Sequence, residues 1–311
     1  GENGKVMVHV QRDTEKLHLV VMNHEHIAGG SSVYEVINQY RALSDDDTSV
    51  KSQDRRFDVT LMINGLPMIH IELKNKQHSY MDGFWQIKKY ISEGKFTGIF
   101  SAVQMFVISN GVDTKYFANS DKELLYSLAF FWTDENNIRI TNLKEFSVSF
   151  LARDHIIKML TKFTILNDTD KLMMIMRPYQ VYAVEALVRQ ATLTDKNAYI
   201  WHTTGAGKTL TSFKTAQILA SNPNIKKVIF LVDRKDLDSQ TTEEFNKFET
   251  GSVDATDKTN ILVKQIKDKN KQLIVTTIQK MSNAIKRPQH AKIMELYKDE
   301  KVVFIIDECH R

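Results

Sequence analysis

The most constraining stretch of the chain is residues 198–210, which read Ala-Tyr-Ile-Trp-His-Thr-Thr-Gly-Ala-Gly-Lys-Thr-Leu. An apolar run at 199–201 is typical of a short buried strand, and apolar residues recur at helical spacing after it. The segment between them therefore predicts a phosphate-binding loop at a helix N-terminus, where backbone N–H groups face an anion. Lys208 would reach the β- and γ-phosphates, and the Thr209 hydroxyl would ligate Mg²⁺. The residues expected to hold the nucleotide are Thr204, Gly205, Ala206, Gly207, Lys208 and Thr209.

The general pattern for such loops begins with glycine, whereas this chain has His202 there. On this segment alone, a polar turn between a strand and a helix is the alternative. A second motif favours the nucleotide interpretation. The apolar run 302–306 ends in Asp307 and Glu308, as expected of a buried parallel strand that delivers carboxylates to its C-terminal edge. Asp307 would hold Mg²⁺ through water, and Glu308 would orient the attacking water.

Two more apolar runs, residues 228–232 and 273–275, also end in polar loops. Together with the other two runs they predict one parallel sheet that carries nucleotide at its C-terminal edge. The loops at Arg234 and Thr277 would then be free to contact a nucleic-acid backbone. Gln180 lies near the start of a predicted helix, where its amide could pair with the edge of adenine.

A second informative stretch is residues 55–77, which predicts a β-hairpin with an Asn-Gly turn at 64–65. Glu72 and Lys74 project from one face of its second arm, because side chains alternate along a strand. With Asp58 they match a pattern in which two carboxylates bind Mg²⁺ and a lysine positions or activates water for attack on a phosphodiester.

The register of this hairpin decides whether that site can form. A strict two-residue loop would place Asp58 opposite Ile71, on the face away from Glu72. We therefore predict either a three-residue loop at 64–66 or a bulge near Asp58, so that Asp58 comes opposite Glu72.

Two further side chains would reach the same site. Gln86 and Tyr90 are four residues apart in a helix-compatible segment, so they share one helix face. His70 shares the strand face of Glu72. The alternative for the whole region is a structural hairpin with solvent-facing charges.

Length and composition indicate an ordinary globular protein, with 311 residues, 42% hydrophobic and 26% charged. We expect domains at 1–160 and 177–311, separated by a linker or connecting helix at 161–176. No apolar run is long enough to cross a membrane, so we expect a cytoplasmic protein. The single cysteine, Cys309, excludes an intrachain disulfide and a cysteine-based zinc cluster. A net charge of +4 is compatible with a polyanionic partner but does not decide the function.

Four segments of the chain are distinctive: Trp-His-Thr-Thr-Gly-Ala-Gly-Lys-Thr, Val-Asp-Arg-Lys-Asp-Leu-Asp, Thr-Thr-Ile-Gln-Lys and Asp-Glu-Cys-His-Arg. With the preceding Asn-Gly-Leu-Pro-x-x-x-Ile-Glu-Leu-Lys they closely resemble the R (restriction) subunit of type I restriction-modification enzymes. The resemblance implies an α/β protein, in which a PD-(D/E)xK nuclease-like domain precedes a RecA-like parallel-sheet motor lobe of superfamily 2. The implied activity is that of a type I site-specific deoxyribonuclease, with ATP-dependent DNA translocation coupled to Mg²⁺-dependent double-strand cleavage.

In that family the nuclease motifs fall on Asp58, Glu72, Lys74, Gln86 and Tyr90. The ATP motifs fall on Gln180, Gly205, Gly207, Lys208, Thr209, Asp307 and Glu308. The resemblance implies double-stranded DNA as the substrate. It also implies the methyltransferase and specificity subunits of the same complex as partners, and no association with a membrane. The chain stops at Arg311, so we expect a fragment that lacks the second motor lobe. The alternatives are another helicase-nuclease, such as a type III restriction subunit, and a DNA remodeller with a non-catalytic nuclease fold.

Overall fold

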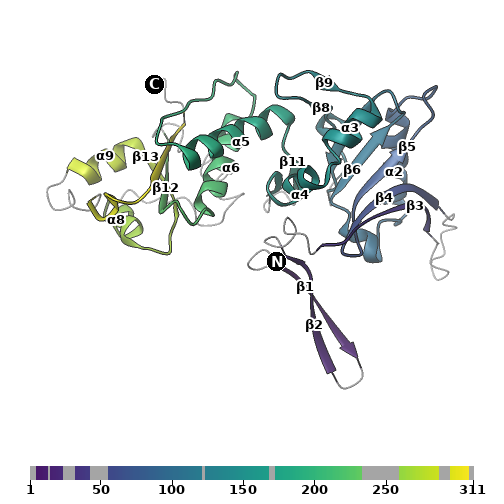
Figure 1. Ribbon diagram of the computed structural model, residues 1–311, viewed down its shortest axis with the longest axis horizontal. Coiled ribbons are helices and arrows are strands. Elements are labelled where there is room, and N and C mark those ends of the chain that lie inside the picture. The colour runs from purple at the N-terminus through teal and green to yellow at the C-terminus, as the bar shows by residue number, and fades with distance from the viewer. Residues whose placement is uncertain are drawn as a thin grey trace. The chain divides into compact units, whose positions relative to one another are not determined.

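The chain divides into two compact units. Unit 1 comprises Gly1–Ile165 and Lys171–Arg177, and unit 2 comprises Leu166–Asp170 and Pro178–Arg311. The computed structural model in Figure 1 describes residues 5–12, 15–23, 32–42, 55–120, 123–167, 172–232, 259–286 and 295–307. None of the helices in these ranges has both the length and the apolar character needed to span a bilayer.

Unit 1 is built on a five-stranded sheet with the order β3-β4-β5-β6-β7. Its strands are β3 (Tyr34–Ala42), β4 (Arg55–Ile63), β5 (Leu66–Leu73), β6 (Met105–Ser109) and β7 (Thr114–Ala118). β5 and β6 run parallel, whereas the other neighbouring pairs in this sheet are antiparallel. Because parallel neighbours cannot be joined by a tight turn, the chain crosses over between β5 and β6, and helix α2 (Met81–Ser92) forms part of that crossover.

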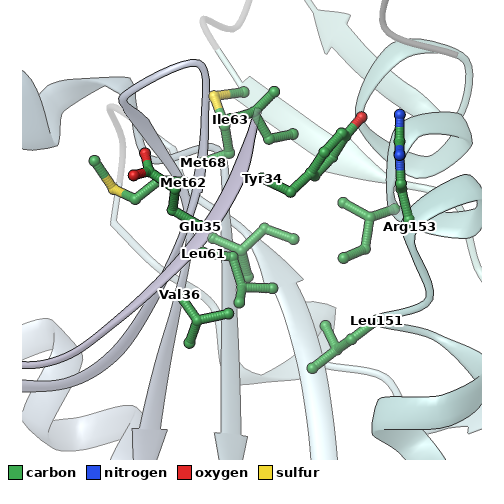
Figure 2. A pocket seen from close by; sticks show the side chains of 11 residues that line it. Tyr34, Glu35, Val36, Leu61, Met62, Ile63, Met68, Leu151 and Arg153 are labelled. Carbon is green, nitrogen blue, oxygen red and sulfur yellow. The ribbon is translucent and has the colours of Figure 1, made fainter. Parts of the chain in front are cut away.

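A cavity of about 150 Å³ lies beside the β4–β5 turn (Figure 2). Met62 and Met68 line it from the hairpin, and Leu151 lines it from the segment before helix α4 (Arg153–Thr161). The Arg153 guanidinium lies 4.5 Å from the centroid of the Tyr34 ring, which is a cation–π distance. The lining includes none of the residues predicted for catalysis or nucleotide binding.

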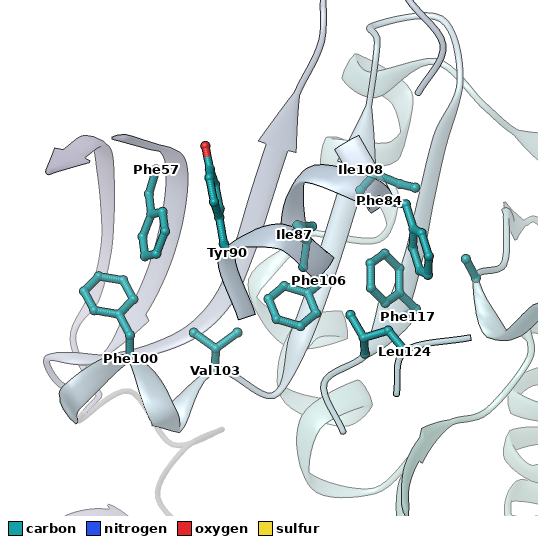
Figure 3. Packing of buried hydrophobic residues seen from close by; sticks show 11 residues of the cluster. Phe57, Phe84, Ile87, Tyr90, Phe100, Val103, Phe106, Ile108, Phe117 and Leu124 are labelled. Atoms are coloured by element: carbon teal, nitrogen blue, oxygen red, sulfur yellow. The ribbon is translucent and has the colours of Figure 1, made fainter. Parts of the chain in front are cut away.

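Helix α2 packs on β5 and β6, over the aromatic core of unit 1 (Figure 3). Its buried side includes Phe84, Ile87 and Tyr90, which recur every three residues and therefore share one face. They belong to one cluster with Phe57 and Phe106, both fully buried. Burying one such phenylalanine contributes about 1.5–3 kcal/mol, so this cluster holds α2 firmly in place on the sheet.

Shorter elements complete the chain up to residue 177. Besides α4 they are β1 (Lys5–Arg12), β2 (Glu15–Asn23), η2 (Gly98–Ala102), η3 (Tyr126–Leu128), β8 (Trp132–Thr133), β9 (Arg139–Ile140), α3 (Leu143–Ser149), β10 (Thr164–Asn167) and β11 (Leu172–Ile175). β1 pairs with β2, β8 with β9, and β10 with β11. Within 161–176, the described residues 161–167 and 172–176 contain no helix beyond Thr161, the last residue of α4. Phe163 and Ile165 are buried while Thr164 is half-buried, and this alternation is that of a strand.

Unit 2 contains a three-stranded parallel sheet with the order β13-β12-β14, which confirms the parallel pairing expected for these three runs. Its elements are β12 (Lys227–Val232), β13 (Leu273–Thr277), β14 (Val302–Ile306), α5 (Pro178–Leu193), α6 (Lys208–Ala220), α8 (Thr259–Lys267) and α9 (Ile278–Lys286). In the central strand β12, Val228, Phe230 and Val232 pack with α6, whereas Ile229 and Leu231 pack with α8 and α9. Helices cover both faces of the sheet, which is an α/β arrangement.

The apolar run before the phosphate loop does not join this sheet. Residues 196–203 lie in neither a helix nor a strand, and Tyr199, Ile200 and Trp201 are 79, 39 and 89% exposed. The prediction of a buried strand at 199–201 is therefore wrong. Three residues can form only a few ladder hydrogen bonds, and an apolar run alone does not distinguish a strand from an extended segment.

Lys227, the first residue of β12, is only 1% exposed although it carries an ammonium group. This group donates hydrogen bonds to the backbone carbonyls of Asp268 and Lys271, just beyond the end of α8. Its Nζ also lies 5.7 Å from the centroid of the Tyr297 ring. Because the C-terminal end of a helix presents carbonyls without intrahelical donors, Lys227 caps α8 from the neighbouring strand.

We expect Lys227→Met to weaken the packing of α8 on β12 by about 1.5–3 kcal/mol, because it removes the charged donor from these part-buried carbonyls. Hydrogen–deuterium exchange of the α8 and β12 amides measures the effect, and exchange should become faster in both segments. Lys226→Met, at the half-exposed neighbouring position, is the matched control and should change the stability by less than about 0.5 kcal/mol. Equal exchange in the two variants would contradict the capping role.

Candidate active site

The β4–β5 hairpin turns at Asn64 and Gly65, which have φ angles of +51° and +78°. Positive φ at both central residues is the geometry of a two-residue type I′ turn, and the strands next to the turn pair accordingly. The register then shifts between Leu61 and Met62, because Met68 is an extra residue on β5. This is a β-bulge, which changes the pairing of every residue beyond it.

Past the bulge, Val59 pairs with Ile71, so the next residue, Asp58, comes opposite Glu72. This is the odd offset that the candidate site requires, and the predicted bulge is confirmed. It lies closer to the turn than to Asp58. Plain two-residue pairing would have placed Asp58 opposite Ile71, facing away from Glu72.

The structure brings four of the predicted residues into one hydrogen-bonded group. Lys74 Nζ lies 2.7 Å from Glu72 Oε1 and 2.5 Å from Gln86 Oε1. Gln86 Nε2 in turn donates a hydrogen bond to the Tyr90 hydroxyl. The Glu72 side chain is 1% exposed and that of Lys74 is 17% exposed, so the lysine forms the solvent-facing side of a buried carboxylate. Strand β5 carries Glu72, and Lys74 is the first residue after that strand. Gln86 and Tyr90 lie on one face of α2.

Asp58 completes the group from β4. Its Oδ2 accepts a hydrogen bond from the backbone N–H of Leu73, at 2.8 Å. Burial raises the pKa of Asp58, the Leu73 N–H lowers it, and the negative charge of Glu72 raises it further. Burial also raises the pKa of Tyr90, and the Glu72 charge acts in the same direction. The site thus concentrates negative charge in a poorly solvated place.

The two carboxylates suit a divalent cation. Within the described residues, no three His, Cys, Asp or Glu side chains are placed to form a metal cluster. Mg²⁺, however, usually takes only one or two carboxylates and completes its shell with water and substrate phosphate oxygens. Burial is the main cause of the raised pKa of Asp58 and the Glu72 charge adds to it, so a cation between Asp58 and Glu72 would stabilise both carboxylates in their charged form. The donor set therefore fits Mg²⁺ bound together with a phosphate substrate.

Gly83 is a residue of this site that the sequence reasoning missed. A Cβ atom on Gly83 would lie 3.3 Å from Ile108 Cγ2 and 3.6 Å from Glu72 Cγ. The absence of a side chain therefore lets the first turn of α2 approach Ile108 on β6 closely, whereas Glu72 on β5 lies at ordinary van der Waals distance. A glycine in the first turn of a helix facing the predicted carboxylates was the available signal.

The phosphate loop leads directly into α6, which begins at Lys208. Gly205 and Gly207 have φ angles of +77° and +75°, in the left-handed region that favours glycine. A Cβ on Gly207 would lie 2.5 Å from Gln180 Nε2, so a side chain here would displace the Gln180 amide as well as strain the backbone at this positive φ. Thr204 and Gly205 are exposed, whereas residues 206–209 are half-buried.

Two side chains from α5 hold this loop. The Tyr179 hydroxyl donates to the Ala206 carbonyl at 2.9 Å, and Gln180 Nε2 donates to the same carbonyl at 3.1 Å. Gln180 therefore contacts the loop itself, and its pairing with adenine stays a prediction. Tyr179 was not assigned a role from the sequence, although it lies directly before Gln180. Its ring also meets the His202 ring edge-on, with centroids 5.6 Å apart.

The remaining residues predicted for the nucleotide or for nucleic acid are Asp307, Glu308, Arg234 and Thr277. Asp307 directly follows β14, and its N–H donates to the Leu231 carbonyl at 3.0 Å. Glu308 and Arg234 lie outside the described residues. Thr277 is 4% exposed, and its Oγ1 accepts the Lys280 N–H at 3.1 Å. Thr277 itself therefore caps the start of α9, and contact between its loop and a nucleic-acid backbone stays a prediction.

Comparison with known proteins finds two families along the chain. Residues 2–124 match the family described as "Type I restriction enzyme R protein N terminus", and residues 179–311 match "SWI2/SNF2 ATPase". The type I restriction enzyme SsaAORF53P endonuclease subunit of Staphylococcus saprophyticus is 55% identical over 278 residues, which cover 89% of this chain and 29% of that protein. The chain thus spans less than a third of the length of this relative.

Two more distant relatives have the same kind of name. One, from Mycoplasma pneumoniae, is named as the C-terminal part of the putative type I restriction enzyme MpnIIP endonuclease subunit. It is 38% identical over 192 residues, or 58% of this chain and 92% of that protein. The type I restriction enzyme EcoprrI endonuclease subunit of Escherichia coli is 36% identical over 137 residues, or 43% of this chain and 44% of that protein.

Proposed function

The chain belongs to the family of type I restriction enzyme endonuclease subunits, and from this premise we propose that it carries two chemical sites of such an enzyme. Residues 1–160 would form a Mg²⁺-dependent nuclease of the PD-(D/E)xK type, joined through 161–176 to a first RecA-like lobe at 177–311. The proposed activity is ATP-dependent DNA translocation coupled to cleavage of double-stranded DNA. Methyltransferase and specificity subunits are the proposed partners, and the cytoplasm is the proposed location. The observation that carries the nuclease proposal is the bulged register that sets Asp58 opposite Glu72.

In the proposed nuclease, Asp58 and Glu72 hold Mg²⁺. The bound ion would polarise the scissile phosphodiester and stabilise the charge that develops on it. Lys74 keeps its ammonium between oxygens of Glu72 and Gln86, where its third N–H can orient a water or a phosphate oxygen. The Tyr90 hydroxyl accepts a hydrogen bond from Gln86 Nε2. The amide oxygen of Gln86 is therefore left directed toward Lys74. Gln86 and Tyr90 thus fix the position of the lysine.

In the proposed motor lobe, the backbone of the phosphate loop surrounds the ATP phosphates at the N-terminus of α6. Lys208 neutralises the β- and γ-phosphates, and Thr209 and Asp307 hold the Mg²⁺ that accompanies ATP. Glu308 orients the attacking water. Support comes from the positive φ angles of Gly205 and Gly207, which open the loop backbone toward an anion.

Asp58→Asn tests the nuclease assignment in the complete subunit assembled with its partners. We expect linearisation of a circular target plasmid to fall at least about a hundredfold, because the variant removes one of two proposed ligand charges and with it several kcal/mol of transition-state stabilisation. Hydrolysis of ATP should continue, since the substitution lies in the other unit. Agarose-gel analysis with and without Mg²⁺ measures cleavage, and phosphate release measures ATP hydrolysis.

Asp154→Asn is the matched control, because Asp154 is an exposed carboxylate on α4 of the same unit. This variant should cut like the wild type. Cleavage at the wild-type rate in Asp58→Asn would instead leave the hairpin with a structural role only, and a DNA remodeller would become the better assignment.

A further inference from the structure

His70 is a buried histidine whose position the proposed chemistry does not yet explain. Its side chain is 0% exposed, and neither ring nitrogen has a hydrogen-bond partner. It lies on β5 two residues before Glu72, on the same strand face. Its Nε2 lies 3.4 Å from Glu72 Oε2.

The surroundings of the His70 ring are aromatic. The ring centroids of Phe57, Phe96 and Phe106 lie 4.7, 5.4 and 6.3 Å from that of His70. An apolar ring of similar size would suit this environment better, because two buried ring nitrogens without partners destabilise the fold. Packing alone therefore favours phenylalanine at this position. A polar neighbour of the imidazole must account for the histidine.

That neighbour is the inner oxygen of Glu72. The outer oxygen, Oε1, accepts a hydrogen bond from Lys74 at 2.7 Å. The inner oxygen, Oε2, is buried and has no hydrogen-bond partner, and it faces the His70 ring nitrogen. A carboxylate held on one side only can rotate, whereas a donor on each side sets both its position and its plane.

We propose that His70 is a positioning residue for Glu72, which it holds from inside the domain by donating its Nε2–H to Oε2. A small approach of the two groups from 3.4 Å makes this bond, and Oε1 then remains directed toward Lys74 and the metal. The inference rests on the proposed nuclease function, because it assigns Glu72 to a metal site. It adds a residue that contacts neither metal nor DNA and acts only through the carboxylate.

Metal binding tests the proposal independently of cleavage. Mn²⁺ is titrated into the 311-residue chain without nucleotide, and bound Mn²⁺ is followed by electron paramagnetic resonance. In His70→Phe we expect the apparent affinity to fall about 10- to 100-fold, the usual effect of losing a partner that orients a metal ligand. The thermal midpoint should stay equal or rise, since the phenyl ring suits the aromatic surroundings. His70→Gln should retain most of the affinity, because its amide N–H can reach the same oxygen.

Two reference variants make the outcome decisive. Thr60→Val removes a buried hydroxyl without a partner at the residue that pairs with His70 across the hairpin, and it should leave Mn²⁺ affinity unchanged. Asp58→Asn should abolish the binding that is assigned to this site. If it does so while His70→Phe binds Mn²⁺ as the wild type does, the role of His70 is refuted and the nuclease proposal stands. If the wild type shows no Mn²⁺ binding that depends on Asp58, both proposals are refuted.

Discussion

Lys74→Ala in the complete, assembled enzyme is expected to abolish DNA cleavage while ATP hydrolysis and translocation persist. The substitution removes the ammonium that lies 2.7 Å from Glu72 Oε1 and 2.5 Å from Gln86 Oε1. A group that positions or activates the attacking water typically contributes about 10²- to 10⁴-fold to the rate, so the loss of cutting should fall in that range. Linearisation of a circular plasmid and phosphate release, measured on the same preparation, give the two activities.

A loss of cutting could also arise from local unfolding, because Glu72 is left as a buried charge without its lysine. Lys74→Met keeps most of the aliphatic stem, and a thermal midpoint close to that of the wild type would exclude unfolding. The matched control is Lys76→Ala, an exposed lysine two residues further along the chain, which should change the cutting rate less than about threefold. Efficient cutting by both Lys74 variants would remove this lysine from the proposed mechanism.

Lys208→Ala is expected to abolish ATP hydrolysis and, as a consequence, cutting of intact target DNA. Lys208 is the first residue of α6, directly after the glycine loop, where its ammonium would neutralise the transferred phosphate. The family resemblance implies that cutting follows translocation, so the dependence runs in one direction only. We therefore expect loss of Lys74 to leave ATP hydrolysis intact, and loss of Lys208 to remove both ATP hydrolysis and cutting.

The two variants must be compared at one salt concentration, since binding to the phosphate backbone falls steeply with ionic strength. Lys196→Ala, an exposed lysine in the segment before the loop, is the control for lost positive charge and should retain both activities. If Lys208→Ala linearised the plasmid at the wild-type rate, the motor would not control the nuclease. A nuclease with an accessory ATP site would then be the better assignment.

The candidate nuclease site was predictable from the sequence because strand periodicity is a local property. Alternation places Glu72 and Lys74 on one face whatever the rest of the chain does. The same rule showed that a two-residue turn and a paired Asp58 are incompatible, and so it required an extra residue in the hairpin. The choice between a longer loop and a bulge was left open, because the local sequence allows both.

The nucleotide loop illustrates the opposite case. The glycines at 205 and 207 mark a loop with positive φ, and this much follows from their residue type. That Tyr179 and Gln180 both bond to the Ala206 carbonyl depends on how α5 approaches the loop. The exposed run at 199–201 likewise depends on which strands pair at the sheet edge, and a three-residue pattern carries no information about that.

By itself, then, the sequence determined which residues are candidates for the chemistry, which of them share a strand or helix face, and that the candidate site needs an odd offset in the hairpin. Tertiary structure alone decided that a bulge at Met68 supplies the offset and that Gly83 lets α2 pack closely on Ile108, beside Glu72. It also decided that His70 faces the inner oxygen of that carboxylate. The physical reason is that periodicity depends on neighbours along the chain. Bulges, close approaches and buried polar contacts are instead set by the packing of segments that lie far apart in sequence.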